Sequence, residues 1–361
     1  MEFNDIKAQY KLIADDVQKR FSGICEKGSF IMGAEVKEVE DTLAKYVGAS
    51  FSIAVANGTD ALTLALMAID LKEGEEVIMP AFTYFATAEA TAILKGKCVF
   101  VDINEETYNI DENLIEKAIT KKTRAIMPVS LFGQCSNMKK INEIAKKHNL
   151  VVIEDAAQSF GAEYEGKKSC NLSAIASTSF FPSKPLGCYG DGGMLFTSDD
   201  EIAKKLKMLR VHGQSVKYKH DIVGMNSRLD TLQAAVLLEK IKLFDSETIA
   251  RQNIANRYNE ALKGKFVIPV IANYNNVSVY AQYVLRAKNR DALLAHLKSL
   301  DIPSAIYYPI PLPMHEVFNG MYQESDYPIS SKVSKEVFSI PFSPYLTEED
   351  QEKVIKALLS F

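Results

Sequence analysis

The fold class of this chain is decided by residues 98–155, CVFVDINEETYNIDENLIEKAITKKTRAIMPVSLFGQCSNMKKINEIAKKHNLVVIED. Short runs rich in Val and Ile alternate there with longer segments whose apolar residues recur at helical spacing. Strands are predicted at 98–101, 125–129 and 151–153, with helices between them at 113–119 and 138–148. Strands and helices that alternate in this way form a parallel sheet covered on both faces, and ligands bind beyond the carboxyl ends of its strands.

The alternation runs from residue 51 to residue 199, and the pattern changes beyond it. A long amphipathic helix is predicted at 228–240, continuing through 245–262, and it links two domains. The elements predicted beyond this helix are one strand and two helices, at 277–286, 290–300 and 348–359. We therefore expect a large domain of residues 1–240, whose N-terminal segment can pack on the other domain, and a smaller α+β domain of residues 241–361.

Composition and charge exclude several classes of function. The chain has 361 residues, a net charge of -4 and an isoelectric point near 5.9, and it lacks a basic run with interleaved aromatic residues. These properties argue against binding to nucleic acid or to an acidic membrane surface. No apolar stretch approaches transmembrane length and no signal-peptide pattern is present, so we expect a cytoplasmic protein. The five cysteines have no metal-ligand spacing, and Cys188 is expected to be a small buried residue.

The segment 178–193, TSFFPSKPLGCYGDGG, places Lys184 among apolar residues, prolines and glycines. Charged side chains are rarely buried without a partner. A desolvated lysine amine is less readily protonated, which frees it as a nucleophile toward carbonyl groups. Lys184 is therefore the first candidate for a site of covalent attachment.

Two segments could bind a phosphate group. Gly58 and Thr59 follow a strand-like segment and open an amphipathic helix, where backbone N–H groups and a hydroxyl favour an anion. An ordinary N-cap formed by Thr59 or Asp60 explains the same residues equally well. Ser179, five residues before Lys184, can supply a second hydroxyl, although a serine at a strand end usually bonds its own backbone.

Other residues near predicted strand ends suit a planar aromatic cofactor. Asp155 ends an apolar strand, and a carboxylate there can hold the nitrogen of a pyridine ring protonated, unless it only caps the following turn. Gln158 can donate to a ring hydroxyl or be a solvated glutamine. Tyr84 can cover one face of the ring or be an ordinary core aromatic.

Together, a phosphate cradle, a stacking aromatic, a strand-end aspartate and a loop lysine match the needs of pyridoxal 5′-phosphate. Over essentially its whole length the chain resembles the fold-type I, pyridoxal-phosphate-dependent sugar aminotransferases of the DegT/DnrJ/EryC1/StrS group. The matching stretches are 57–62, 80–88, 153–159, 179–193 and 224–230. The resemblance implies an α/β fold, with a mostly parallel seven-stranded sheet flanked by helices in the large domain and a smaller α+β C-terminal domain.

The resemblance also implies roles for individual residues. Lys184 corresponds to the Schiff-base lysine that moves protons, and Asp155 to the partner of the pyridine nitrogen. Asn226, by itself only a polar residue in a loop before a helix, corresponds to a residue that reaches the phosphate in the neighbouring subunit. An obligate homodimer with shared active sites is therefore expected. The other residues that correspond to cofactor contacts are Gly58, Thr59 and Ser179 at the phosphate, Tyr84 on the ring face and Gln158 at the ring hydroxyl.

Five segments carry a more specific resemblance within this family: 168–173, 180–193, 212–214, 226–235 and 279–283. They are similar to the enzymes that aminate C3 of UDP-2-acetamido-2-deoxy-3-oxo-glucuronate for bacterial lipopolysaccharide (O-antigen) biosynthesis. This implies L-glutamate as the amino donor, 2-oxoglutarate as its product and pyridoxamine 5′-phosphate as the intermediate form of the cofactor. The substrate-binding residues implied are Arg228, Tyr307 and Tyr308. Arg228 can pair with a carboxylate or phosphate, or be structural. Tyr307 replaces a histidine of close relatives and offers no cation near neutral pH.

Three alternatives stay open. The substrate can be another 3-keto or 4-keto sugar linked to UDP or dTDP. The chain can be a dehydratase of the same fold, but such enzymes resemble this family and carry histidine where this chain has Lys184. A non-catalytic regulator that binds the cofactor is the third alternative, and it does not need the complete set of lysine, aspartate, glutamine and aromatic residues found here.

Overall fold

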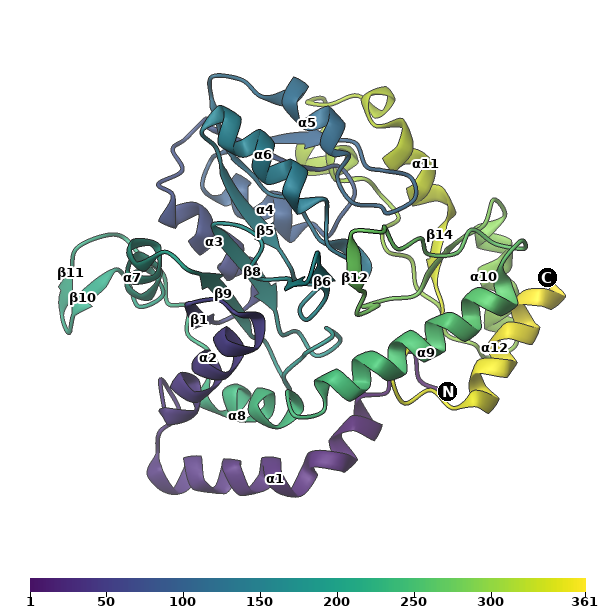
Figure 1. Ribbon diagram of the computed structural model, residues 1–361, viewed down its shortest axis with the longest axis horizontal. Helices are drawn as coiled ribbons and strands as arrows, with labels where there is room; N and C mark the ends of the chain where they lie inside the picture. The colour runs from purple at the N-terminus through teal and green to yellow at the C-terminus, as the bar shows by residue number, and fades with distance from the viewer.

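A seven-stranded sheet forms the centre of the computed structural model, which describes residues 1–361 apart from the side chain of Asn276 (Figure 1). The strand order is β1-β9-β8-β5-β4-β2-β3. The strands are β1 (Phe51–Val55), β2 (Glu76–Pro80), β3 (Lys97–Val101), β4 (Thr123–Ile126), β5 (Val151–Asp155), β8 (Ile175–Ser179) and β9 (Gly193–Thr197). Strands β8, β5, β4, β2 and β3 are parallel, and β9 is antiparallel to both of its neighbours. The predicted mostly parallel α/β sheet is confirmed.

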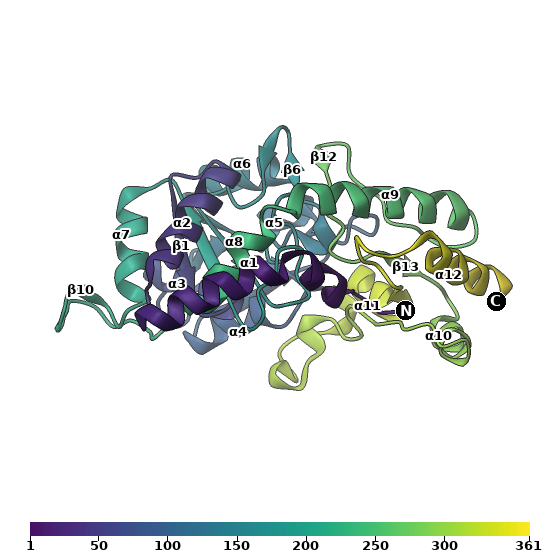
Figure 2. The ribbon, with the colours of Figure 1, turned by 90° about the horizontal axis from the view of Figure 1, so that it is seen from below.

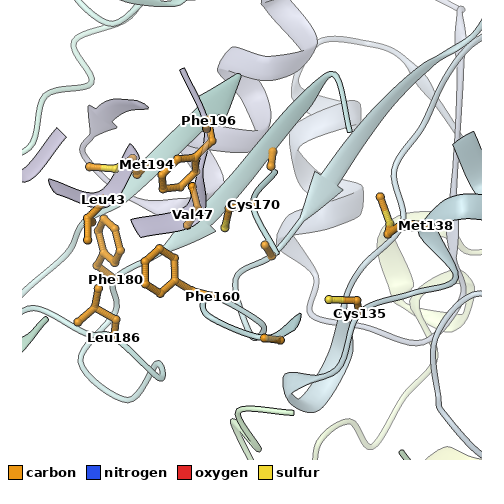
Figure 3. Packing of buried hydrophobic residues seen from close by; sticks show 14 of the residues in the cluster. Leu43, Val47, Cys135, Met138, Phe160, Cys170, Phe180, Leu186, Met194 and Phe196 are labelled. Atoms are coloured by element: carbon orange, nitrogen blue, oxygen red, sulfur yellow. The ribbon is translucent and has the colours of Figure 1, made fainter. Parts of the chain in front are cut away.

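Helices cover both faces of this sheet because both faces of its strands are apolar. In β2, for example, Val77 and Met79 face one layer and Ile78 faces the other. The helices on the side of Ile78 are α2 (Ala34–Val47), α5 (Glu112–Ala118), α6 (Met138–His148) and α8 (Thr231–Lys240). Those on the side of Val77 are α3 (Gly58–Ala68), α4 (Ala86–Ile93) and α7 (Asp200–Leu209). Figure 3 shows Phe160 and Phe180 in the first of these layers, packed near residues of α2.

The C-terminal part of the chain has a hydrophobic core of its own. That core contains residues of α9 (Phe244–Leu262), α10 (Arg290–Ser299) and α12 (Glu348–Ser360) and of the antiparallel pair β13 (Val284–Arg286) and β14 (Val337–Ser339). Helix α11 (Pro328–Glu336) precedes β14, and short 3₁₀ helices lie at 131–133, 312–314, 316–318 and 324–326. This separate core supports our proposal of domains at 1–240 and 241–361.

Three peripheral elements connect or extend the domains. Helix α1 (Ile6–Lys27) lies along α8 (Figure 2). The residues before α1 contact the C-terminal part of the chain, since the Phe3 carbonyl accepts a 3.0 Å hydrogen bond from Phe342 N. A small sheet joins β12 (Asn275–Val277) to β6 (Glu163–Tyr164) and β7 (Lys167–Lys168). The hairpin β10 (Gln214–Val216) and β11 (Lys219–His220) projects from the body of the molecule (Figure 1). Among the described residues, no helix is long and apolar enough to cross a membrane.

Two sequence predictions were wrong in their extent. The helix expected from 228 through 262 begins at Thr231 and is interrupted between Lys240 and Phe244. The strand expected at 277–286 exists only at its two ends, because Val279 N and Ala281 N donate to the carbonyls of Gly133 and Phe132 in a turn and not to a strand. The buried position of Cys188 is confirmed: its sulfur lies 3.0 Å from the Phe180 carbonyl oxygen and 3.1 Å from that of Gly190, and its one S–H can donate to either.

Candidate active site

A cavity of about 670 Å³ lies at the carboxyl ends of the central strands, the place that the parallel sheet predicts for a ligand. Its volume is that of a site for a ligand of drug-like size. Every site residue predicted from the sequence lines this cavity except Asn226 and Arg228. The tertiary structure thus brings together residues that lie more than 200 positions apart in the chain.

The start of α3 and the end of β8 form one end of the cavity. Asn57, and not Thr59 or Asp60, caps α3, since its side-chain oxygen accepts a 2.8 Å hydrogen bond from Asp60 N. The first N–H groups of a helix have no partner within it, so those of Gly58 and Thr59 can bind an anion. A Cβ atom on Gly58 would lie 2.7 Å from that of Ser179, so glycine is required for this close approach. The arrangement fits a phosphate group.

Ser179 also makes the local hydrogen bond that the alternative interpretation predicts. Its Oγ accepts from Phe181 N at 3.3 Å. Because a serine hydroxyl is both a donor and an acceptor, its proton is still available to a phosphate oxygen. The two interpretations of Ser179 are therefore compatible.

Asp155 is almost fully buried at the end of β5 and is held in one orientation. Its Oδ1 accepts from Ala157 N at 3.1 Å, and its Oδ2 accepts from the Thr87 hydroxyl at 3.1 Å. Burial raises the pKa of Asp155, and the positive charge of Lys184 acts against this rise. A buried carboxylate of this kind is stabilised by a cationic partner, and the protonated nitrogen of a pyridine ring fits that requirement.

Lys184 faces the same cavity from the loop between β8 and β9. Desolvation lowers the pKa of its amine, and the negative charge of Asp155 opposes that effect. The loop backbone is fixed from several sides: Lys184 N donates to the Phe181 carbonyl at 2.8 Å, and the Pro185 carbonyl accepts from Arg251 at 3.4 Å. The structure therefore offers an amine of lowered pKa on a loop held by hydrogen bonds, which suits attachment to a carbonyl group.

Gln158 is not the solvated glutamine of the alternative interpretation, because only 2% of it is exposed. Its Oε1 accepts from Phe132 N and its Nε2 donates to the Tyr308 hydroxyl, both at 2.9 Å. One N–H of the amide is left for a ring hydroxyl. Tyr84 is not a core aromatic either, since 58% of it is exposed at the cavity, with its ring centroid 6.1 Å from that of Tyr308.

The predicted substrate residues differ in their positions. Tyr307 and Tyr308 line the cavity, and burial raises the pKa of both phenols, so both are neutral hydroxyls near pH 7. Asn226 and Arg228 lie outside the cavity of their own chain, in the loop before α8. Asn226 is exposed, and the Nε of Arg228 is buried with no hydrogen-bond partner among the described residues.

Two residues of the site were missed by the sequence interpretation, one behind Asp155 and one on the cavity wall. Thr87 orients Asp155 from the first turn of α4, and Gln282 lies on the wall within the segment that was expected to be a strand. Thr87 falls inside a family-like stretch but has no local pattern of its own. Gln282 falls inside the stretch 279–283 that resembles the 3-oxo-glucuronate enzymes, but no local pattern separates it from an ordinary strand residue.

Comparisons with known proteins agree with this geometry. Residues 11–359 match the profile of the DegT/DnrJ/EryC1/StrS aminotransferase family. The chain is 49% identical over 358 residues to UDP-2-acetamido-2-deoxy-3-oxo-D-glucuronate aminotransferase of Pseudomonas aeruginosa. The alignment covers 99% of each of the two chains. A DegT/DnrJ/EryC1/StrS aminotransferase structure from Brucella abortus superposes with a TM-score of 0.96 at 40% identity, covering 100% of this chain and 99% of the other.

A second solved structure contains a form of the cofactor. NtdA from Bacillus subtilis, solved with bound pyridoxamine phosphate, superposes with a TM-score of 0.89 at 32% identity and covers 96% of this chain and 81% of its own. The family profile, the identity to the relative and the shared fold agree over nearly the whole length. The chain belongs to the DegT/DnrJ/EryC1/StrS aminotransferase family.

Proposed function

We propose that this protein transfers the amino group of L-glutamate to a nucleotide-linked keto sugar with pyridoxal 5′-phosphate as cofactor. The substrate is UDP-2-acetamido-2-deoxy-3-oxo-D-glucuronate, which becomes the 3-amino sugar, as the name of the 49% identical relative indicates. The observation that carries the proposal is one cavity that combines Lys184 and Asp155 with a phosphate cradle at the start of α3. The regulator alternative does not explain this complete set, and Lys184 argues against a dehydratase, which has histidine at this position.

Each residue of the set has a chemical task. Pyridoxal phosphate, when bound, supplies an electron sink and carries the amino group between the two substrates. Asp155 stabilises positive charge on the ring nitrogen. The Lys184 amine takes the proton from the α-carbon of glutamate and delivers a proton to C3 of the sugar, for which its lowered pKa is suited. Tyr84 covers the ring and Gln158 binds its hydroxyl.

We also propose that two copies of the chain share their active sites. Among the residues that line the cavity, Lys184 is the only cation, while Asp60, Asp155 and Asp191 are acidic. A nucleotide sugar carries negative phosphates, so further cations are needed to bind it. Arg228, which does not line the cavity of its own chain, is suited to supply one to a second copy, with Asn226 near it in sequence at the cofactor phosphate.

Exposed apolar residues near the same loop support this assembly. Tyr218 in the β10–β11 hairpin and Val223 in the loop that follows are 82% and 86% exposed. Burial of such side chains against a second copy is favourable. The role of the product in bacterial surface polysaccharide stays a prediction.

The function is tested by amination assays on a panel of keto sugars. Glutamate-dependent amination is expected with the UDP-linked 3-keto uronate and not with dTDP-linked 4-keto sugars. Activity only on a dTDP-linked 4-keto sugar would refute the substrate while leaving the transamination intact. A protein that binds the cofactor but shows no change in its absorbance with glutamate would support the regulator alternative.

A further inference from the structure

Gln282 has an unpaired polar atom at the wall of the active-site cavity. It comes from the segment between β12 and β13, and its side chain is half-buried. Its Oε1 is buried and has no hydrogen-bond partner among the described residues. A buried carbonyl oxygen without a partner is unfavourable, so a ligand that donates a hydrogen bond to it gains affinity.

The backbone that carries Gln282 is fixed to the turn at 131–133. Val279 N and Ala281 N donate to the carbonyls of Gly133 and Phe132, at 2.9 and 3.0 Å. Since Phe132 N donates in turn to Gln158, the same turn positions both glutamines. Gln282 therefore has a defined place relative to the residue that binds the cofactor ring.

This close docking depends on a glycine. Gly133 has a φ of +106°, and a Cβ atom there would lie 2.4 Å from Tyr280 N. Only a residue without a side chain allows the small-domain segment to approach so closely. The backbone next to Gln282 is thus held in a defined position at the cavity wall.

The chemistry of the Oε1 atom selects between the two substrates. Glutamate has two carboxylates, which only accept hydrogen bonds, and its amino group is the group transferred at the cofactor. A sugar has hydroxyl groups, and a 2-acetamido sugar also has an amide N–H, all of which donate. The other small-domain residues of the wall, Tyr307 and Tyr308, are neutral as well.

We propose that Gln282 binds an uncharged ring substituent of the nucleotide sugar, a hydroxyl or the acetamido N–H, and so determines specificity in the sugar half-reaction. This inference rests on the proposed function. The contact is independent of a carboxylate at C6, because an unpaired carbonyl oxygen repels an anion. Gln282 is a substrate-binding residue, and the cofactor and glutamate do not need it.

The test measures the two half-reactions separately, from the absorbance of the bound cofactor. One uses L-glutamate, and the other uses UDP-2-acetamido-2-deoxy-3-oxo-D-glucuronate or the same sugar with a hydroxymethyl group at C6. Gln282→Leu is expected to lower kcat/KM for both sugars by about 5- to 150-fold, which equals about 1–3 kcal/mol at about 1.4 kcal/mol per factor of ten. The glutamate half-reaction is expected to stay within about twofold of wild type, below 0.5 kcal/mol on the same scale.

The matched control is Gln252→Leu. Gln252, on α9, donates at 3.3 Å to the carbonyl of Ser278, which belongs to the same segment as Gln282. Gln252 itself does not line the cavity. It is expected to leave both half-reactions unchanged. A similar loss of sugar activity in this control, an equal loss in both half-reactions of Gln282→Leu, or no loss at all would overturn the role of Gln282.

The proposed function is judged by the wild type alone. If the wild type takes the amino group from glutamate but aminates no keto sugar of the panel, the proposed function is wrong and the role of Gln282 falls with it. If the wild type aminates a sugar and only the variants behave differently from expectation, the proposed function stands. The two failures are therefore distinguishable.

Discussion

Glu154 gives the protein a stability that depends on pH. Its side chain is completely buried beside Asp155, and no cation pairs with it among the described residues. The Ser169 hydroxyl donates to its Oε1 at 2.7 Å, and Cys170 N donates to its Oε2 at 3.2 Å. Burial, helped by the charge of Asp155, raises the pKa of Glu154 from 4.5 to about 7.

The size of the effect follows from this pKa. The difference between about 7 and 4.5 is worth about 3 kcal/mol, at about 1.4 kcal/mol per pKa unit. The folded state binds the proton more tightly than the unfolded state does. The contribution to stability is therefore complete below about pH 4.5, the ordinary value, and is lost as the pH rises to about 7.

Glu154→Gln is expected to remove this dependence. The glutamine oxygen can accept from Cys170 N, and its amide can donate to the Ser169 hydroxyl, which in turn lies 2.7 Å from the Ser159 hydroxyl. Relative to wild type, the free energy of unfolding of the variant should thus rise by about 2.5 kcal/mol between pH 5 and pH 8, the part of the effect that falls in this range.

The assay is urea unfolding followed by circular dichroism at several pH values, with saturating cofactor. Glu260→Gln, at an exposed position, serves as the control and is expected to follow the wild type. A constant difference between wild type and Glu154→Gln over the whole range would refute the reasoning, because an unshifted carboxyl gives no such slope.

The remaining predictions concern the site and its support. Lys184→Arg should still bind the cofactor phosphate but lower turnover by at least about 10²-fold, as measured by glutamate-dependent amination, since a guanidinium does not exchange protons near neutral pH. Asp155→Asn should bind the cofactor more weakly and also lose activity, because the charge opposite the ring nitrogen is gone; unchanged kcat would contradict that role. Gly133→Ala should lower the thermal midpoint, since its Cβ atom would lie 2.4 Å from Tyr280 N at a φ of +106°, and a strain of about 1–3 kcal/mol is expected. A melting curve equal to that of wild type would show that the turn adapts.

Local sequence was enough to find the sheet and its catalytic edge. Apolar runs such as 151–153 are strands wherever they occur in an alternating α/β pattern, and parallel strands all end at the same edge. Residues that follow those strands, such as Asp155 and Lys184, therefore had to approach one another. Their chemical types then specified what kind of ligand they could hold.

The tertiary structure decided the contacts between distant segments. The N-cap of α3 is Asn57, whereas the residue types had suggested Thr59 or Asp60, because the cap depends on where the helix begins in the folded chain. The bond between Gln158 and Tyr308 joins residues 150 positions apart. Gln282 lies at the cavity because Gly133, which has no side chain, lets residues 279–281 pack against the turn at 131–133.

The physical reason is the range over which each kind of information acts. Hydrophobic periodicity reports which face of an element is buried, and it extends over a few turns or strand residues. It does not report which side chain of another element fills the space opposite. The sequence by itself therefore determined the sheet and the candidate pair of Lys184 and Asp155, whereas packing between distant segments decided which neutral groups line the cavity.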